Sequence, residues 1–163
     1  MKYSYIIFFV LCFLPLMTTS CFDSCDGEEF NFRARIEILM SHRELLELEY
    51  TDKNNEKHRV KGNIKGRFVE FCLNKEPLEL QFVFQKYKKS EKVTIESLLL
   101  ENDDNQMFIE KKMFYSYFNS NKSIKYNKEE NSYSLLDDSP NHISPILISR
   151  KSLKNRLKKR LVL

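Results

Sequence analysis

Apolar and polar residues alternate along several segments of the chain, most clearly over residues 30–40. Every even position from Phe30 to Met40 is apolar, whereas the positions between them include Asn31, Arg33 and Glu37. Successive side chains of a strand point to opposite faces, so this spacing produces one apolar and one polar face. The pattern predicts a strand that is buried on one side.

Residues 45–50 show the same alternation over a shorter stretch. Leu46, Leu48 and Tyr50 alternate with two glutamates, which favours a second strand. A helix is the alternative, because Ser41 and Glu44 have the spacing of a capping box. The following residues, 51–57, are rich in Asp and Asn and predict a turn.

Residues 60–84 are the stretch around which we expect the other strands to gather. They contain two of the three glycines, and the even positions from 78 to 84 are all apolar. We predict two neighbouring strands joined by residues 74–77, with Pro77 at the first position of the second strand, where proline is tolerated. Gly62 and Gly66 predict a bulge, a sharp bend or a close approach of the backbone.

The second half of the chain contains further β-prone segments. Residues 93–100 predict a buried strand or a short helix, and residues 103–105 predict a hairpin turn. Residues 107–118 are aromatic and β-prone, and residues 124–126 and 133–136 predict a last hairpin. About eight strands without intervening helices predict an all-β fold, either a sandwich or a barrel. We expect a small antiparallel sandwich of the immunoglobulin-like type, with most Phe and Tyr side chains in its core.

The amino-terminal segment has the character of a secretory signal peptide. Lys2 precedes an apolar segment at residues 6–17, and the small residues 18–20 suit signal peptidase. A transmembrane helix needs about 20 apolar residues, so this segment is short for one. A retained signal anchor and an acylated Cys21 are the alternatives.

These features predict the domain organisation of the 163-residue chain. We expect a signal peptide at residues 1–20, an amino-terminal arm at residues 21–29 and a β-sandwich domain at residues 30–137. Residues 138–163 should form a linker and a basic carboxy-terminal tail or short helix. The product should be secreted and extracellular.

Three cysteines remain once Cys12 leaves with the signal peptide, namely Cys21, Cys25 and Cys72. In an oxidising compartment we expect one disulfide, from Cys72 to either Cys21 or Cys25, which would fix the arm to the central strand. The third thiol would be free or would join a second copy of the chain in a homodimer. Alternatively, Cys72 is a small buried apolar side chain.

Charge is distributed unevenly along the chain. Residues 150–160 contain no acidic residue and seven basic ones: Arg150, Lys151, Lys154, Arg156, Lys158, Lys159 and Arg160. Leu153, Leu157 and Leu161 recur every four residues, which places them on one face of a helix. A basic amphipathic helix of this kind can bind a polyanion or an anionic membrane surface, and the alternative is a solvated tail.

Sequence motifs of catalysis and metal binding are missing. His42, His58 and His142 belong to no metal-binding or nucleophile motif, and no phosphate-binding glycine loop occurs. We therefore expect no enzyme activity, cofactor, metal ion or nucleic-acid partner. Asn121-Lys122-Ser123 is a sequon that predicts N-glycosylation of Asn121.

Residues 64–109 resemble the nematode transthyretin-like secreted proteins. The resemblance is carried by Ile64-Lys65-Gly66, by Cys72 with the following turn to Pro77, by the alternating residues 78–84 and by residues 98–108. The second family cysteine has no counterpart near residues 115–123. The resemblance implies an extracellular β-sandwich of the transthyretin-like type that binds small hydrophobic ligands or cell surfaces. It does not imply the related hydrolase activity, because the carboxy-terminal Tyr-Arg-Gly-Ser signature is missing.

Two functions are compatible with these features. The first is a secreted, non-enzymatic β-sandwich that binds an extracellular partner or a small hydrophobic ligand. The second is a protein that binds a polyanion or a membrane surface through residues 150–160. A hydrolase would require the three histidines to converge with a carboxylate.

Overall fold

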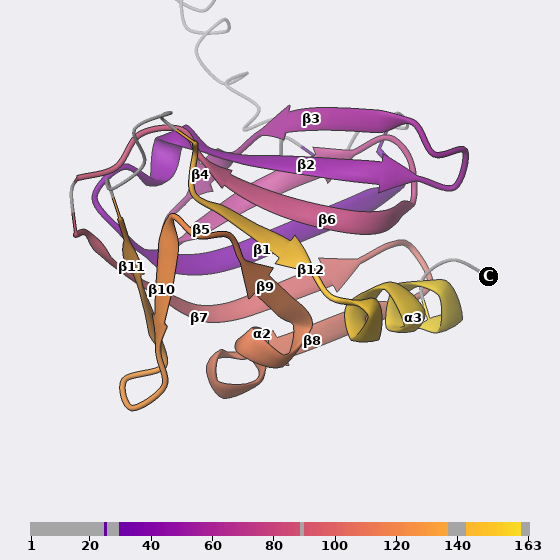
Figure 1. The fold of residues 1–163 in the computed structure, drawn as a ribbon. Helices are drawn as coiled ribbons and strands as arrows, with labels where there is room; N and C mark the ends of the chain where they lie inside the picture. The colour runs from indigo at the N-terminus through magenta and orange to yellow at the C-terminus, as the bar shows by residue number, and fades with distance from the viewer. Residues whose placement is uncertain (1–24, 26–29, 89, 137–142, 161–163) are drawn as a thin grey trace, which may run out of the picture.

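The computed structural model describes residues 25, 30–88, 90–136 and 143–160, except for the side chain of Arg160. In this part of the chain, twelve strands form two antiparallel sheets that pack face to face (Figure 1). The prediction of an all-β antiparallel sandwich is therefore confirmed, although the strands are more numerous than expected.

The first sheet, sheet A, has the strand order β10-β11-β7-β1-β5-β4, and β8 also pairs with β7. Its strands are β1 (Phe32–Leu39), β4 (Asn63–Lys65), β5 (Phe68–Leu73), β7 (Lys92–Glu101), β8 (Gln106–Glu110), β10 (Ile124–Asn127) and β11 (Ser132–Leu135).

The second sheet, sheet B, has the strand order β3-β2-β6-β12-β9. Its strands are β2 (Leu46–Asp52), β3 (Lys57–Lys61), β6 (Pro77–Phe84), β9 (Phe118–Ser120) and β12 (Ile146–Ser149). The described residues also form the 3₁₀-helix η1 (Arg43–Leu45) and the α-helices α2 (Lys111–Tyr117) and α3 (Lys151–Arg160).

The two strands predicted from strict alternation are both present. In β1, the even positions Phe32 to Ile38 are buried, and the odd positions are partly exposed. In β2, Leu46, Leu48 and Tyr50 are buried in the same way. The helix considered at this position is limited to the single turn η1, so the alternation determined the local structure.

Residues 60–84 are β-structured, but the prediction that their two strands are neighbours is wrong. Strand β5 belongs to sheet A and β6 to sheet B, because residues 74–76 carry the chain from one layer to the other. Each strand therefore pairs with a strand distant in sequence, β5 with β1 and β6 with β2.

Gly62 lies where the chain passes from β3 in sheet B to β4 in sheet A. A Cβ atom on Gly62 would be 2.2 Å from Cγ1 of Val69, so a larger residue would collide with the core. Gly66 has φ +59° in the tight turn between β4 and β5. Both glycines thus have the backbone roles expected of them.

Strand β7 contains a β-bulge that changes which side chains face the core. The register with β1 shifts between Glu37, which is opposite Ser97, and Ile38, which is opposite Ile95. The inward-facing residues are Val93 and Ile95 before the bulge and Leu98 and Leu100 after it. An extra residue in one strand reverses the alternation, and this leaves Leu99 on the outer face of sheet A.

Residues 107–118 are only partly β-structured. Strands β8 and β9 agree with the prediction, but residues 111–117 form α2, so the prediction is wrong there. Phe114 and Tyr117 are three residues apart and are both buried, which places them on the same helical face. Phe114 also stacks on Phe118 with ring centroids 4.3 Å apart, so packing against the sandwich favours this helix turn.

The sandwich extends beyond residue 137, where we expected a linker and a basic tail or short helix; the short helix is present as α3. Strand β12 lies between β6 and β9 inside sheet B, and α3 follows it at one end of the sandwich (Figure 1). Leu147 of β12 and Leu153 and Leu157 of α3 are completely buried. The domain boundary at 137 is therefore wrong, because later residues complete the second sheet and the core.

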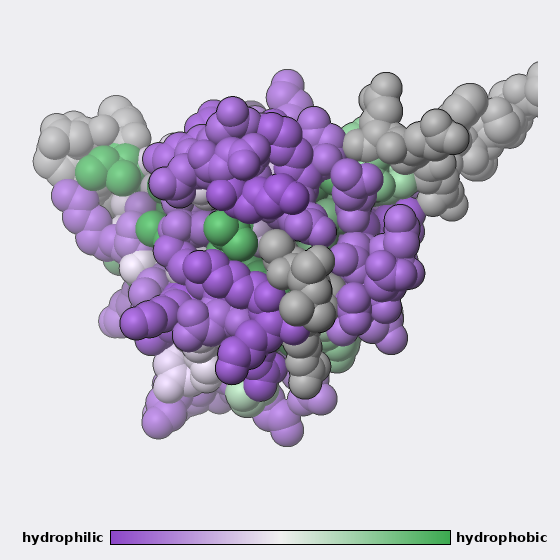
Figure 2. All heavy atoms as spheres, turned by 90° about the vertical axis from the view of Figure 1, so that its right-hand side faces the viewer, coloured by the Kyte–Doolittle hydropathy of each residue, from purple (hydrophilic) through white to green (hydrophobic). Residues whose placement is uncertain are grey.

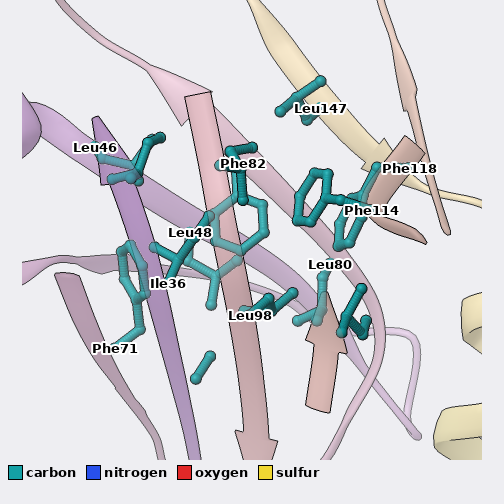
Figure 3. Packing of buried hydrophobic residues seen from close by; sticks show 14 of the residues in the cluster. Ile36, Leu46, Leu48, Phe71, Leu80, Phe82, Leu98, Phe114, Phe118 and Leu147 are labelled. Carbon is teal, nitrogen blue, oxygen red and sulfur yellow. The ribbon is translucent and has the colours of Figure 1, made fainter. Parts of the chain in front are cut away.

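The core lies between the two sheets and is rich in aromatic side chains. Figure 3 shows Phe82 of sheet B close to Phe114 and Phe118, with Leu48, Leu80 and Leu98 beside them. The ring centroid of Phe82 is 5.5 Å from that of Phe118 and 5.9 Å from that of Phe71 in sheet A. Most aromatic side chains of the described residues are buried as predicted, whereas Phe108 and Tyr115 are exposed.

Candidate functional site

The outer face of sheet A contains a hollow of about 750 Å³. We call this surface the sheet A hollow. It extends from the start of β5 across β1, β7 and β8 to the first residues of α2. It is lined by Arg35, Glu37, Arg67, Phe68, Glu96, Ser97, Leu99, Phe108, Glu110, Lys111, Lys112 and Asn131.

Strand register explains the arrangement of the hollow. Arg35 of β1 is opposite Leu99 of β7, and Leu99 is opposite Phe108 of β8. These three side chains therefore form a row across the outer face of the sheet. Phe108 is 60% exposed, which is the largest exposure among the large apolar side chains of the described residues. Together with Phe68 of β5, Leu99 and Phe108 form an apolar floor that solvent reaches at Phe108.

The charged residues that line the hollow are paired with one another or with near neighbours. Nε of Arg67 is 3.2 Å from Oε1 of Glu37, and Nζ of Lys111 is 2.9 Å from Oε1 of Glu96. The guanidinium of Arg35 donates to Glu101 at 3.0 Å. Lys112 lies 4.0 Å from Glu110. Because the charges compensate each other, apolar contact and shape dominate what this surface can recognise.

Helix α3 forms a second and different surface. It contains most of the basic residues singled out in the sequence, and the predicted amphipathic pattern places Leu153 and Leu157 on one face. Both leucines are buried against the core, whereas Leu161 lies outside the described residues. The apolar face of α3 is therefore covered by the protein itself.

Three basic residues of this segment take part in attaching α3 to the sandwich. Nε of Arg150 donates to the carbonyl oxygen of Phe118 at 3.1 Å. Nζ of Lys154 is 2.6 Å from a carboxylate oxygen of Glu79 on β6. The guanidinium of Arg156 lies 5.0 Å from the ring centroid of Tyr117. These contacts hold the helix in a defined orientation.

The remaining described lysines of α3 point into solvent. Lys151, Lys158 and Lys159 are exposed, and none has a hydrogen bond or an ion pair with another described residue. The side of the molecule that carries α3 and the turn between β2 and β3 is mainly hydrophilic (Figure 2). The structure does not describe the side chain of Arg160.

Cys25 and Cys72 form a disulfide, which confirms one of the two predicted pairings. It joins the amino-terminal arm to β5 across a sequence separation of 47 residues. Cys25 is itself buried, so this point of the arm is fixed to the fold. Glu70 lies beside the two sulfurs, but thiols bonded to each other are not available as thiolate ligands. Cys21 lies outside the described residues.

A polar cluster surrounds Asp52 at the end of β2. Its Oδ1 accepts hydrogen bonds from the backbone N–H groups of Asn54 and Glu56, and its Oδ2 is 3.0 Å from Nε2 of His58. Burial would raise the pKa of Asp52, but these hydrogen bonds and one from Lys75 together hold that pKa below its usual range. The carboxylate therefore fixes the turn between β2 and β3.

The carboxylates of Asp52 and Glu56 and the imidazole of His58 are close enough together to hold a metal ion. However, Nζ of Lys75 is 2.6 Å from Glu56 and 3.2 Å from Asp52, so an ammonium group already balances the two acids. The hydrogen bonds to these acids raise the pKa of Lys75 and keep it charged. The ammonium group of Lys75 thus takes the position between the two acids that a metal ion would occupy.

The histidines named as hydrolase candidates are distributed over the fold. His42 precedes β2 and interacts with Glu44, whereas His58 stacks on Tyr50 near the other end of the same strand. The intervening strand is roughly 20 Å long at about 3.4 Å per residue. These two histidines therefore do not share a pocket, and His142 lies outside the described residues.

Asn121 of the sequon has a structural role in the loop before β10. Its Nδ2 donates to the carbonyl oxygen of Ser144 at 2.8 Å, and its Oδ1 accepts from the N–H groups of Ser123 and Ile146. Ser123 is buried and donates to the carbonyl oxygen of Ile143. The sequon residues thus connect the β9–β10 loop to the start of β12.

Comparisons with family models, curated proteins and solved structures give no match to this chain. The resemblance to nematode transthyretin-like proteins accordingly stays a prediction. It covers β5 to β7 and most of β8. These strands include Phe68, Leu99 and Phe108, which form the floor of the sheet A hollow.

The apolar floor of the hollow was not recognised from the sequence. The sequence pattern places Phe108 in a β-prone aromatic segment and Leu99 in a buried strand. Leu99 faces outward only because of the bulge in β7, and single-residue shifts of this kind have no sequence signal here. Met107, Phe108 and Ile109 are three consecutive apolar residues between Gln106 and Glu110. Their pattern therefore does not indicate which of them faces the core and which faces solvent.

Proposed function

We propose that this chain is an extracellular, non-enzymatic β-sandwich that binds a small hydrophobic ligand or an apolar segment of an extracellular partner. The observation that carries the proposal is the apolar floor of the sheet A hollow, in which Phe108 is exposed and Phe68 and Leu99 are partly exposed. Exposed apolar surface in a concave site is typical of a binding function.

Two features support a binding role for this face. The hollow of about 750 Å³ is within the range of ligand sites, which is roughly 300–1,000 Å³. It is also built on sheet strands and not on long loops, so its side chains are held by the core beneath them. The transthyretin-like resemblance, if it extends to function, implies the same class of ligand.

The disulfide is compatible with an extracellular location. Disulfides such as Cys25–Cys72 form and persist in oxidising compartments. No helix in the described residues is long and apolar enough to cross a membrane.

We further propose cleavage before Cys21 and glycosylation of Asn121. A mass spectrum of the secreted protein, before and after glycosidase treatment, tests both; an intact leader or an unchanged mass would contradict them.

The binding proposal is tested with a fluorescent anilinonaphthalene sulfonate dye as the probe. The double substitution of Leu99→Ser and Phe108→Ser removes most of the apolar floor. We expect dye affinity to fall at least about tenfold, equivalent to about 1.4 kcal/mol, while the circular dichroism spectrum stays unchanged. Leu39→Ser is the matched control, because Leu39 is 55% exposed but does not line the hollow.

Two results would contradict the proposal. One is a native protein that binds no dye. The other is an equal loss of affinity in the double variant and in Leu39→Ser, because that would place the dye on scattered surface residues. Selective loss in the double variant supports the hollow as the binding site.

A further inference from the structure

The solvent-facing side of α3 is a compact cationic surface. With about 100° of rotation per residue, Lys151, Lys158 and Lys159 lie within about 100° of one another around the helix axis. Leu153 and Leu157 lie on the opposite side and are completely buried. We call the solvent-facing side the α3 basic face.

The charges of this face are not neutralised by the rest of the described protein. Residues 151–160 contain no acidic residue. Lys154, whose ammonium pairs with Glu79, lies at the border with the core, whereas Lys151, Lys158 and Lys159 have no acidic partner among the described residues. Bringing three cations together costs energy unless an anion binds to them, so the surface favours a negatively charged partner.

The basic face is held rigidly. The backbone N–H of Arg150 donates to Tyr117 at 2.7 Å, and Oγ of Ser152 donates to the carbonyl oxygen of Ser116 at 3.0 Å. These bonds connect the first turn of α3 to α2, while its leucines are anchored in the core. A preorganised cationic surface loses less conformational entropy on binding than a disordered tail would.

The length of the face favours a linear polymer over a small anion. Lys151 and Lys158 are seven residues apart, which corresponds to about 10 Å along the axis. A single phosphate or sulfate could contact both ammonium groups only if the two lysine side chains bent toward each other along the helix. A chain with repeated anionic groups can contact all three lysines.

We propose that the α3 basic face binds a linear sulfated polysaccharide. A membrane is a poorer partner, because insertion of an amphipathic helix needs an apolar face, and the leucines of α3 are covered by the protein core. The sheet A hollow shares no residue with this face, so the proposal stands independently of the function proposed above.

Nucleic acid is also disfavoured by the structure of this region. Single-stranded nucleic acid is typically bound by free aromatic faces on which bases stack. The ring of Tyr115 stacks on Tyr126 at 5.0 Å, and the guanidinium of Arg150 lies 5.7 Å from its centroid. Arg156 covers Tyr117 in the same manner. The Cys25–Cys72 disulfide also indicates an oxidising compartment such as the extracellular space.

The test measures binding of the full chain to a heparin oligosaccharide by calorimetry at several salt concentrations. The variant combines Lys151→Gln, Lys158→Gln and Lys159→Gln. We expect it to lose at least about tenfold in affinity near physiological salt, and the slope of log affinity against log salt to decrease by roughly two to three. The matched control combines Lys57→Gln, Lys125→Gln and Lys128→Gln, which remove the same charge from exposed positions elsewhere.

The outcomes are distinct. Loss of binding in the α3 variant together with retention in the control supports the proposal. Absence of heparin binding by the native chain, or equal losses in both variants, overturns it. Binding to anionic phosphatidylserine vesicles or to single-stranded DNA that is tighter than binding to heparin also overturns it, because the partner is then of another class. Circular dichroism of both variants verifies that the fold is intact.

Discussion

The sheet A hollow and the α3 basic face are both exposed, but they differ in how their charges are arranged. In the hollow, Arg67 and Lys111 pair with Glu37 and Glu96, and the uncompensated feature is the apolar side chain of Phe108. On α3 the leucines are buried, and the uncompensated features are Lys151, Lys158 and Lys159.

Each surface is therefore defined by the side chains that the fold leaves without a partner. These are apolar in the hollow and charged on α3. Binding in the hollow should depend weakly on salt, because exposed apolar area drives it. Binding at α3 should weaken steeply as salt rises, because it depends on charge. Substitutions that weaken the fold near each surface can show whether the two surfaces are rigid and separate.

The largest expected effect concerns the docking of α3. Leu157→Ala removes a completely buried side chain, so we expect the free energy of unfolding to fall by about 2–5 kcal/mol in urea denaturation. The exposed neighbour Lys158→Ala should change it by less than about 0.5 kcal/mol. If both substitutions are neutral, α3 is not docked, and its leucines would be free to contact a membrane.

The next largest effect concerns the disulfide that fixes the arm to β5. Replacing Cys25 and Cys72 together by alanine removes a long-range cross-link, and the expected loss of stability is about 2–4 kcal/mol. Chemical reduction of the native protein should lower its free energy of unfolding, measured by urea denaturation, by a similar amount. If reduction has no effect on the native protein, the cross-link is absent from it.

A smaller loss of stability is expected at Gly62, which lies against Val69 of β5. Gly62→Ala would place a methyl group in contact with Val69, at an expected cost of about 1–3 kcal/mol. Gly66→Ala is the control, because Gly66 has open space around it and only its positive φ opposes substitution, at about 1 kcal/mol. A thermal melt in which Gly66→Ala is the less stable variant would contradict this account of the β3–β4 crossing.

The smallest effect is a change in pH dependence at Asp52, which lies outside both surfaces. Since hydrogen bonds lower its pKa in the folded protein, the ionised carboxylate stabilises the fold above the pKa of the unfolded chain, about 3.9. This stabilisation is lost as the pH falls below about 4. Unfolding measured between neutral and acid pH should therefore show a flatter profile for Asp52→Asn than for the native chain, and identical profiles would contradict the assignment.

Local patterns were sufficient for most of the fold. The alternation in residues 30–40 predicted β1, the even positions of residues 78–84 predicted β6, and Asp103–Asn105 predicted the β7–β8 turn. Each of these signals arises within one strand or turn, where the periodicity of the side chains is sufficient to indicate the structure.

The pairing of elements distant in sequence could not be predicted in this way. Residues 111–117 are rich in β-prone aromatics, but Phe114 and Tyr117 can both reach the core only from a helix. The assignment of β5 and β6 to different sheets likewise depends on partners that lie far away in sequence. Propensity is overridden where a short segment closes the end of a core.

Alternation, cysteine positions and helical spacing along the chain were enough to indicate the class of fold, the pairing options of Cys72 and the amphipathic nature of residues 150–160. The packing of the folded protein was needed to show that the leucines of α3 face the core and that Leu99 and Phe108 lie on the outer face. The physical reason is that alternation and helical spacing specify which residues share a face. What that face contacts depends on which elements pack against it.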